Sequence, residues 1–440
     1  MHNKPKKYLR ILFIVLVSLL AFLLMLIRPV DHTPYHQSNY YHRTLSGISP
    51  FKPDSGQQVL AGWGRGNITP DSPAPLVAYG RQFNNYKEVA DSCFAKVFMF
   101  RQGEKMAALV CLDLWIMLPR LKGKLSRAIK GQFPAVQQVY VTITHSHHSF
   151  GGWRPGLTGR LILGKYNPTI EKKLISGTLR AAEQAVVAIR PVTVAYQEVE
   201  AGELVKNRLV SGDRYDSRVR CVVLKNPDQR AIITVFSAHA TYLKGAIEKL
   251  SGDYPAALCR ALESSDQFSF AAFAAGGMAS HTPVKRYART IQGVSQYGRA
   301  LADKIINQTD SLSGTPVNRM GVSSIPIRLK EPNLRITDNL KLAPAVFNAL
   351  LGKQTFTLAF LQLGNCVFTG FPGELSGQFY EQLSVTTNRH VIITSFSGAY
   401  CGYVTLPEYD SLKKYETRDM NWYGPDTGTY AMEIINKILN

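Results

Sequence analysis

Paired cysteines are missing from this 440-residue sequence. None of its six cysteines forms a C-x-x-C pair, so neither a zinc ribbon nor a disulfide framework is indicated, and buried thiols are expected. The sequence also has no G-x-S-x-G and no H-E-x-x-H segment, which removes the main sequence support for an α/β-hydrolase or a zincin protease. The cysteines are Cys93, Cys111, Cys221, Cys259, Cys366 and Cys401.

Acidic residues are scarce compared with basic ones. The chain has 31 Asp and Glu against 51 Lys and Arg, which gives a formal net charge of +20 at pH 7. Hydrophobic residues make up 45% of the chain and charged residues 19%, which excludes a disordered chain, a collagen-like fibre and a multi-spanning membrane protein. The basic excess fits an anionic partner, and composition alone leaves a phospholipid surface and nucleic acid both open.

One apolar run stands near the N-terminus, where 17 uncharged residues (11–27) lie between Arg10 and Arg28. The run ends in R-P-V without a small-residue cleavage site, which favours an uncleaved signal anchor or transmembrane helix over residues 1–28 rather than a cleaved signal peptide. The basic residues before the run predict an extracytoplasmic location for the rest of the chain, in the periplasm, a lumen or the exterior. A cleaved N-terminus would make the protein secreted.

The remaining sequence predicts one large domain. Residues 29–57 are rich in Pro, His, Tyr and Ser and predict a stalk or a surface arm. Beyond them, short β-rich runs alternate with helical patterns, which predicts an α/β fold of layered mixed sheets flanked by helices over residues 58–440. The expected strands include 93–100, 107–115, 136–144, 231–237, 268–274 and 367–371, and the expected helices 118–130, 170–190, 287–306 and 430–439.

Three of the ten histidines lie in residues 144–152 (T-H-S-H-H-S-F-G-G), directly after an expected apolar strand. Residues i and i+2 of a strand share a face, so His145 and His147 are expected to converge at its carboxyl end, where open sheets place their sites. Neutral imidazoles clustered at a strand end suit a zinc site. Hydrogen-bonded loop histidines are the structural alternative.

Further zinc-ligand candidates follow other strands. His239 ends the apolar run 232–240 and could supply a second nitrogen, although alone it reads as a core histidine. Glu374 follows the strand 367–371, where an acid could also simply favour a helix N-terminus. Several tyrosines follow Tyr400; these could be aromatic packing, but a phenolate can bind zinc and a phenol can donate to an oxyanion.

Taken in order, these segments resemble the neutral/alkaline (non-lysosomal) ceramidase family. The early G-x-x-x-x-x-I-T-P segment of that family is similar to residues 62–70 (G-W-G-R-G-N-I-T-P), and its T-H-T-H-S-x-P-G-G motif to residues 144–152. Its V-H-P-T segment is similar to 238–241 (A-H-A-T), and its P-G-E-[FL]-[TS] motif to 372–376 (P-G-E-L-S). The family's late tyrosine block ending in Y-G-P-x-T is similar to residues 400–427.

The resemblance implies a zinc-dependent amidohydrolase. It would cleave the N-acyl amide bond of ceramide or a related membrane sphingolipid and release a fatty acid and a sphingoid base. Zn²⁺ would be the cofactor and a ceramide-like lipid the substrate. The resemblance assigns His145, His239, Glu374 and Tyr403 as zinc ligands, and His147, Arg208, Tyr415 and Ser280 as catalytic residues.

Two features depart from the family pattern. Its G-D-V-S-P segment falls on residues 277–281 (G-M-A-S-H), so Met278 replaces the acid and His281 the proline, and His281 is the candidate to take over the role of that acid. The family's immunoglobulin-like C-terminal domain is not expected within these 440 residues.

Two alternatives stay open beside ceramide hydrolysis. One is a zinc amidase acting on a non-sphingoid N-acyl substrate, and the other is a catalytically silent lipid-binding homologue. For the partner of the basic surface we expect an anionic membrane surface rather than nucleic acid, because export is predicted and no interleaved basic and aromatic motif occurs.

Overall fold

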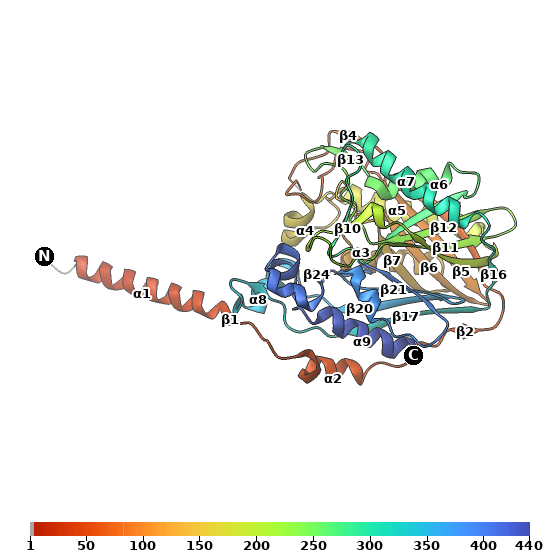
Figure 1. The fold of residues 1–440 in the computed structure, drawn as a ribbon. Coiled ribbons are helices and arrows are strands. Elements are labelled where there is room, and N and C mark those ends of the chain that lie inside the picture. The colour runs from red at the N-terminus through yellow and green to blue at the C-terminus, as the bar shows by residue number, and fades with distance from the viewer. Residues whose placement is uncertain (1–3, 82) are drawn as a thin grey trace.

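A computed structural model describes residues 4–81 and 83–440 of the chain. Its body is a layered α/β domain with helices on the outside of mixed sheets (Figure 1), which confirms the predicted fold class. All six cysteines are free and buried, as expected. The helices are α1 (Lys4–Met25), α2 (Asn39–Leu45), α3 (Pro119–Gln132), α4 (Gly156–Leu163), α5 (Pro168–Val187), α6 (Asp253–Glu263), α7 (Ile291–Thr309), α8 (Pro344–Leu351) and α9 (Thr427–Leu439).

Three five-stranded sheets form the body. Their strand orders are β7-β6-β5-β3-β8, β14-β12-β11-β9-β16 and β2-β17-β20-β21-β23. The first contains β3 (Leu60–Asn67), β5 (Phe94–Gln102), β6 (Lys105–Leu112), β7 (Val136–Ile143) and β8 (Arg190–Pro191). The second contains β9 (Thr193–Glu200), β11 (Arg218–Lys225), β12 (Arg230–Phe236), β14 (Phe270–Ala275) and β16 (Thr315–Pro316). The third contains β2 (Asp54–Ser55), β17 (Arg319–Ile327), β20 (Phe356–Leu363), β21 (Cys366–Gly370) and β23 (His390–Thr394).

Each of these sheets has one parallel pair at an edge in an otherwise antiparallel arrangement. The parallel pairs are β6 with β7, β12 with β14, and β21 with β23. Parallel neighbours need a crossover connection, which α3 supplies between β6 and β7 and α6 between β12 and β14. Carboxyl ends of parallel strands are where open sheets place their sites, and the three pairs provide such ends in all three sheets.

Short strand pairs complete the structure. Strand β1 (Ile27–Pro29) pairs with β19 (Leu340–Leu342), which also pairs with β18 (Leu334–Arg335). The other pairs are β4 (Glu88–Val89) with β13 (Lys249–Leu250), β10 (Val205–Asn207) with β15 (His281–Pro283), and β22 (Glu374–Leu375) with β24 (Tyr403–Val404).

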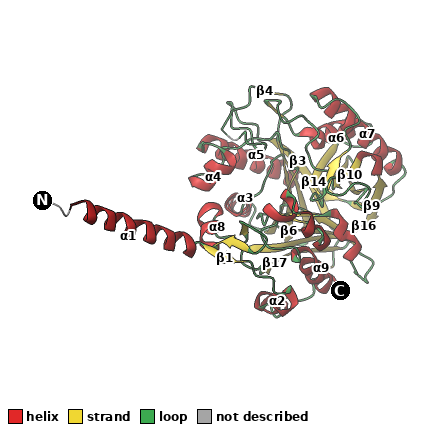
Figure 2. Cartoon of the chain, turned by 60° about the vertical axis from the view of Figure 1, so that its left-hand side comes forward, coloured by secondary structure: helices red, strands yellow, loops and turns green. Residues whose placement is uncertain are grey.

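The inner core lies where the three sheets face one another. One buried cluster combines apolar side chains from each sheet, among them Phe98, Ile233 and Phe368. A second cluster joins the other sheet faces to the helices, which surround the strands in Figure 2. Each sheet therefore contributes apolar side chains to both clusters, one on each of its faces.

Helix α5 lies unusually close to β3, and glycines make this possible. A Cβ atom on Gly62, Gly64 or Gly66 would lie only 2.1, 2.4 and 1.9 Å from carbonyl oxygens of α5. These glycines occupy alternate positions, so they share the face of β3 that α5 covers. The G-W-G-R-G segment of the sequence is thus a packing feature of the sheet rather than part of a binding loop.

Helix α1 lies apart from the body, whereas the segment that follows it packs against the body. Helix α1 points away from the domain in Figure 1, while Tyr35 and Tyr41 donate hydrogen bonds to Glu433 of α9 at 3.1 and 2.6 Å. Among the described residues, no helix has the length and apolar character needed to cross a membrane, so the predicted transmembrane anchor is not supported. Residues 1–3 of that prediction lie outside the described residues. The extracytoplasmic location stays a prediction.

Candidate metal centre and substrate pocket

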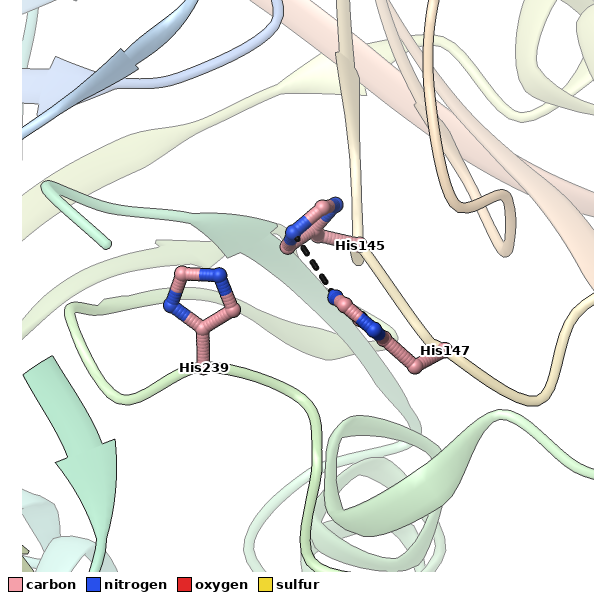
Figure 3. Close-up of side chains that lie close together, drawn as sticks. All are labelled: His145, His147 and His239. Carbon is pink, nitrogen blue, oxygen red and sulfur yellow. Dashed lines mark hydrogen bonds between the residues drawn. The ribbon is translucent and has the colours of Figure 1, made fainter. Parts of the chain in front are cut away.

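Three histidines converge where strands of two sheets end (Figure 3). His145 and His147 follow β7, and His239 follows β12. One ring nitrogen from each lies within 4.8 Å of the others, and the Nε2 atoms of His145 and His147 are 3.1 Å apart. This buried group could hold a metal ion.

The histidines converge through a turn and not through strand alternation. Strand β7 ends at Ile143, and His145 has a left-handed backbone with φ = +58°, which costs a non-glycine residue conformational energy. The two side chains meet, as expected, but the expected cause was wrong, because neither residue lies in the strand. The strained turn brings both rings toward His239.

Hydrogen bonds set the tautomers of two of the rings. His145 donates through Nδ1 to the Trp115 carbonyl oxygen at 2.5 Å, and His239 donates through Nδ1 to the Met278 carbonyl oxygen at 2.8 Å. Since a carbonyl oxygen can only accept, Nδ1 carries the proton in both contacts, and Nε2 of each ring is the nitrogen that faces the centre. Burial, with the nearby Arg208 charge, lowers the pKa of His239 to about 3, so this ring is neutral.

Glu374, the first residue of β22 in the two-stranded sheet that β22 forms with β24, adds a carboxylate. Its Oε2 lies 2.9 Å from Nε2 of His239 and 3.5 Å from Nε2 of His145, and its Oε1 accepts a hydrogen bond from the Tyr400 hydroxyl at 2.6 Å. Burial alone would raise the pKa of Glu374, but the imidazoles of His145 and His239 outweigh it and hold that pKa well below its usual range. The carboxylate is therefore ionised.

The pairing of β22 with β24 brings Tyr403 to the same place. Glu374 and Tyr403 are directly paired in register, and the Tyr403 hydroxyl lies 3.4 Å from Nε2 of His239. The structure thus brings together all four residues that the resemblance assigned as zinc ligands, from strand ends of different sheets. Nitrogen and oxygen donors of this kind suit zinc.

A buried ion pair borders the centre. Arg208 lies 3.2 Å through Nη2 from Nε2 of His239, and its Nε lies 2.5 Å from Oε1 of Glu416. Burial lowers the pKa of Arg208, but the adjoining Glu416 carboxylate more than offsets this and raises it. Arg208 therefore keeps a positive charge beside the metal-binding side chains.

Sequence reasoning missed Glu416. Besides pairing with Arg208, it accepts the backbone N–H of Ser280 at 2.9 Å, where the family pattern has an acid in the serine segment and this chain has Met278. The only signal in the sequence was its place beside Tyr415 in the tyrosine block. Nothing in a linear pattern links residue 416 to residue 280.

Ser280 lies next to this ion pair and not against the histidines. It has φ = +67°, and its carbonyl oxygen accepts the N–H of Arg208 at 2.8 Å. Its buried hydroxyl has no hydrogen-bond partner among the described residues. His281 donates from Nδ1 to the Ala279 carbonyl and accepts the Asp216 N–H at Nε2, so both nitrogens hold the backbone and do not reach the centre.

A cavity of about 570 Å³ opens onto the centre. His147, Glu374, Tyr403 and Tyr415 reach it, and Tyr415 is 59% exposed while its ring lies 5.9 Å from that of Tyr403. The walls are mainly apolar and include Trp115, Ile116, Leu118, Ile162, Leu351 and Met420. Such a cavity fits a ligand with a hydrocarbon part.

Comparison with solved structures identifies the fold. No family model and no curated protein sequence matches the chain. A crystal structure of neutral ceramidase from Pseudomonas aeruginosa superposes with a TM-score of 0.73 at 17% identity, covering 87% of this chain and 74% of that one. A ceramidase complexed with C2 gives a TM-score of 0.72 at 16% identity, covering 87% and 75%.

The class of fold is therefore a mixed α/β domain with a histidine-rich site at its strand ends. In particular, it is the fold of the neutral ceramidase structures, as the sequence resemblance predicted.

Proposed function

We propose that this protein is a metal-dependent amidohydrolase that cleaves the N-acyl amide bond of ceramide or a related lipid. The observation that carries the proposal is the convergence of His145, His239 and Glu374 at one end of an apolar cavity, with His147 beside them. The ceramidase fold supports it. Water would add to the amide carbonyl, the C–N bond would break, and a fatty acid and an amine would leave.

The donor set fits zinc. We assign His145, His239, Glu374 and Tyr403 as its ligands, because their donor atoms converge and two imidazoles present their lone pairs inward. A bound zinc ion would supply an acidified water and polarise the amide carbonyl.

His147 is better suited to donate a hydrogen bond than to bind metal. With Nδ1 of His145 protonated, a hydrogen bond across the 3.1 Å contact would have Nε2 of His147 as its donor, and a zinc ion that took the Nε2 lone pair of His145 would free this N–H. Burial and the neighbouring imidazoles lower the pKa of His147 well below its usual value, which keeps the ring neutral. We propose that Nε2–H of His147 donates to the oxygen that becomes negative when water adds to the carbonyl.

Arg208 and Tyr415 would stabilise the same charge. The guanidinium is held in place by Glu416, so it needs no rearrangement when the oxyanion forms. Tyr415 supplies a phenol at the cavity. We place Ser280 in a positioning role, because its N–H binds Glu416 and its carbonyl binds the Arg208 N–H.

The test combines metal analysis with turnover. Purified protein is expected to contain zinc and to hydrolyse a labelled ceramide, to lose activity on chelation and to regain it with zinc. Absence of zinc, or full zinc retention in a His145→Ala/His239→Ala double variant, would refute the assigned site. Zinc without ceramide turnover would point to a non-sphingoid amide, and lipid binding without any turnover to a silent homologue.

Contact with an anionic membrane surface stays a prediction. Stronger binding to anionic than to neutral vesicles at low salt would support it, since electrostatic binding of a chain with net charge +20 weakens with screening.

A further inference from the structure

One arginine lies in the apolar cavity without a partner. Arg154 is half-buried and lines the cavity together with Leu161, Ile162 and Leu351. Its side chain makes no ion pair and no hydrogen bond with any residue between 4–81 or 83–440. Arginine is seldom removed from water without a partner, because its five N–H donors and its charge then lose hydration.

The Arg154 side chain passes close to two glycines, which leave room for it. A Cβ on Gly159 of α4 would lie 3.1 Å from Cγ of Arg154, and a Cβ on Gly352, just after α8, would lie 3.6 Å from its Nη2. The stem therefore runs along α4 and the guanidinium reaches the end of α8. A Thr158 hydroxyl bonded to the Leu350 carbonyl at 2.7 Å ties these two helices together at this point.

The charge of Arg154 is not balanced nearby. The one acid among the cavity-lining residues is Glu374, whose Oε2 lies 2.9 Å from Nε2 of His239 and which the proposed function assigns to the metal ion. Arg120, whose charge acts on Arg154, is also positive and is itself bound to Glu171. Burial and the Arg120 charge lower the pKa of Arg154.

We infer that Arg154 binds an anionic group of the substrate, a carboxylate, sulfonate or phosphate. This inference rests on the proposed function and narrows it: the preferred substrate is an acidic N-acyl amide, such as an acidic derivative of ceramide or an N-acyl amino acid, rather than an uncharged ceramide. The planar guanidinium can take two oxygens of such a group at once, and the apolar walls strengthen the contact. The hydrocarbon part of the substrate occupies the rest of the cavity.

Water-soluble short-chain amides test the inference by turnover. Three substrates are compared: an uncharged N-acyl amine, the same compound with a carboxylate on the amine half, and one with a carboxylate at the far end of the acyl half. One of the two acidic amides is expected to have a kcat/KM about 10- to 100-fold above that of the uncharged amide, as charged hydrogen bonds imply. Omitting lipid separates an acidic substrate from an acidic membrane lipid.

Variants of Arg154 test whether this residue causes the preference for an acidic amide. Arg154→Gln is expected to remove this preference, measured as the ratio of kcat/KM for the acidic and the uncharged amide, while Arg154→Lys keeps the charge and only part of the preference. Arg160→Gln is the matched control, because Arg160 is an exposed arginine of α4, the helix that follows Arg154, and does not line this cavity. No preference in the wild type, or a full preference in Arg154→Gln, would overturn the inference.

A binding measurement keeps the inference testable without turnover. An alkyl sulfonate and the matching alkyl alcohol are titrated into metal-stripped protein, since a metal ion would itself attract an anion. The sulfonate is expected to bind about 10-fold more weakly to Arg154→Gln than to Arg160→Gln, and the alcohol equally to both. Equal sulfonate affinities would overturn the inference. Absence of amide hydrolysis together with this binding difference would refute the proposed function and leave the anion site in place.

Discussion

Two cavities of similar size differ in how they treat their charges. The cavity at the histidines has a volume of about 570 Å³, and several polar side chains that line it are not paired with one another. A second cavity of about 460 Å³ is lined by three basic and three acidic residues. In the second cavity the charges pair: Arg65 with Glu263 at 2.9 Å, Arg260 with Asp91 at 3.5 Å and Lys96 with Glu263 at 3.7 Å. Asp113 completes the acidic set.

The difference teaches that charge alone does not mark a site. Polar groups that satisfy one another serve stability, whereas buried groups left without a counterpart indicate a ligand. Glu374 Oε2 and His147 Nδ1 are buried atoms without a hydrogen-bond partner among the described residues, and Arg154 is a cation without an anion. Substitutions in the cavity at the histidines should therefore lower activity, and substitutions in the second cavity should lower stability.

The largest effect is expected from removing two histidines. His145→Ala/His239→Ala should lose bound zinc and lower kcat/KM by about 10³-fold or more, because the activated water is lost with the metal. Metal analysis and ceramide hydrolysis measure both. His390→Ala is the control, since His390 lies on β23 and lines neither cavity. Unchanged zinc content in the double variant contradicts the assignment.

A substitution in the second cavity should change the stability of the protein rather than its activity. Lys96 is buried, donates to the Ala271 carbonyl at 2.5 Å and lies near Glu263, so Lys96→Met should lower the free energy of unfolding by about 3 kcal/mol. Chemical denaturation measures this change. The kcat of the folded variant should match the wild type, and a large fall in kcat would show that this cavity takes part in the reaction.

Arg208→Gln should reduce kcat about 10²-fold, because a preorganised donor to the oxyanion is lost. The variant leaves Glu416 buried without its partner, so Arg208→Gln/Glu416→Gln serves as the matched control that removes both charges. Single-turnover kinetics on both variants, with zinc content checked, give the measurement. Wild-type kcat in the double variant would exclude a catalytic role for Arg208.

The smallest effect concerns pH. Burial raises the pKa of Asp113 to about 6, against the partial offset of Lys96, so the folded state holds this proton more tightly than the unfolded state. The proton stabilises the fold below pH 4, and that contribution is lost as pH rises through 6, by about 1 kcal/mol between pH 5 and 7. Asp113→Asn should remove this dependence in denaturation curves. An unchanged pH slope in the variant would show that Asp113 titrates normally.

Local patterns predicted the elements well, because each strand and helix carries its own apolar periodicity. The expected strand 136–144 is β7 (Val136–Ile143), and the expected helix 170–190 is α5 (Pro168–Val187). The ordered motifs also led to His145, His239, Glu374 and Tyr403, which the structure brings together. What failed was the geometric reason for His145 and His147, since a left-handed turn is a tertiary outcome.

The sequence by itself determined the class of fold and the residue types of the site, since hydrophobic period and motif order are local properties of the chain. Only the tertiary structure decided that Glu416 accepts the Ser280 N–H, and that both ring nitrogens of His281 bind backbone groups. It also decided that Arg154 lines the apolar cavity, with no ion pair to any residue that the structure describes. The Ser280–Glu416 contact joins residues 136 positions apart and the Asp216–His281 contact residues 65 positions apart, so only the packing of the three sheets brings them together.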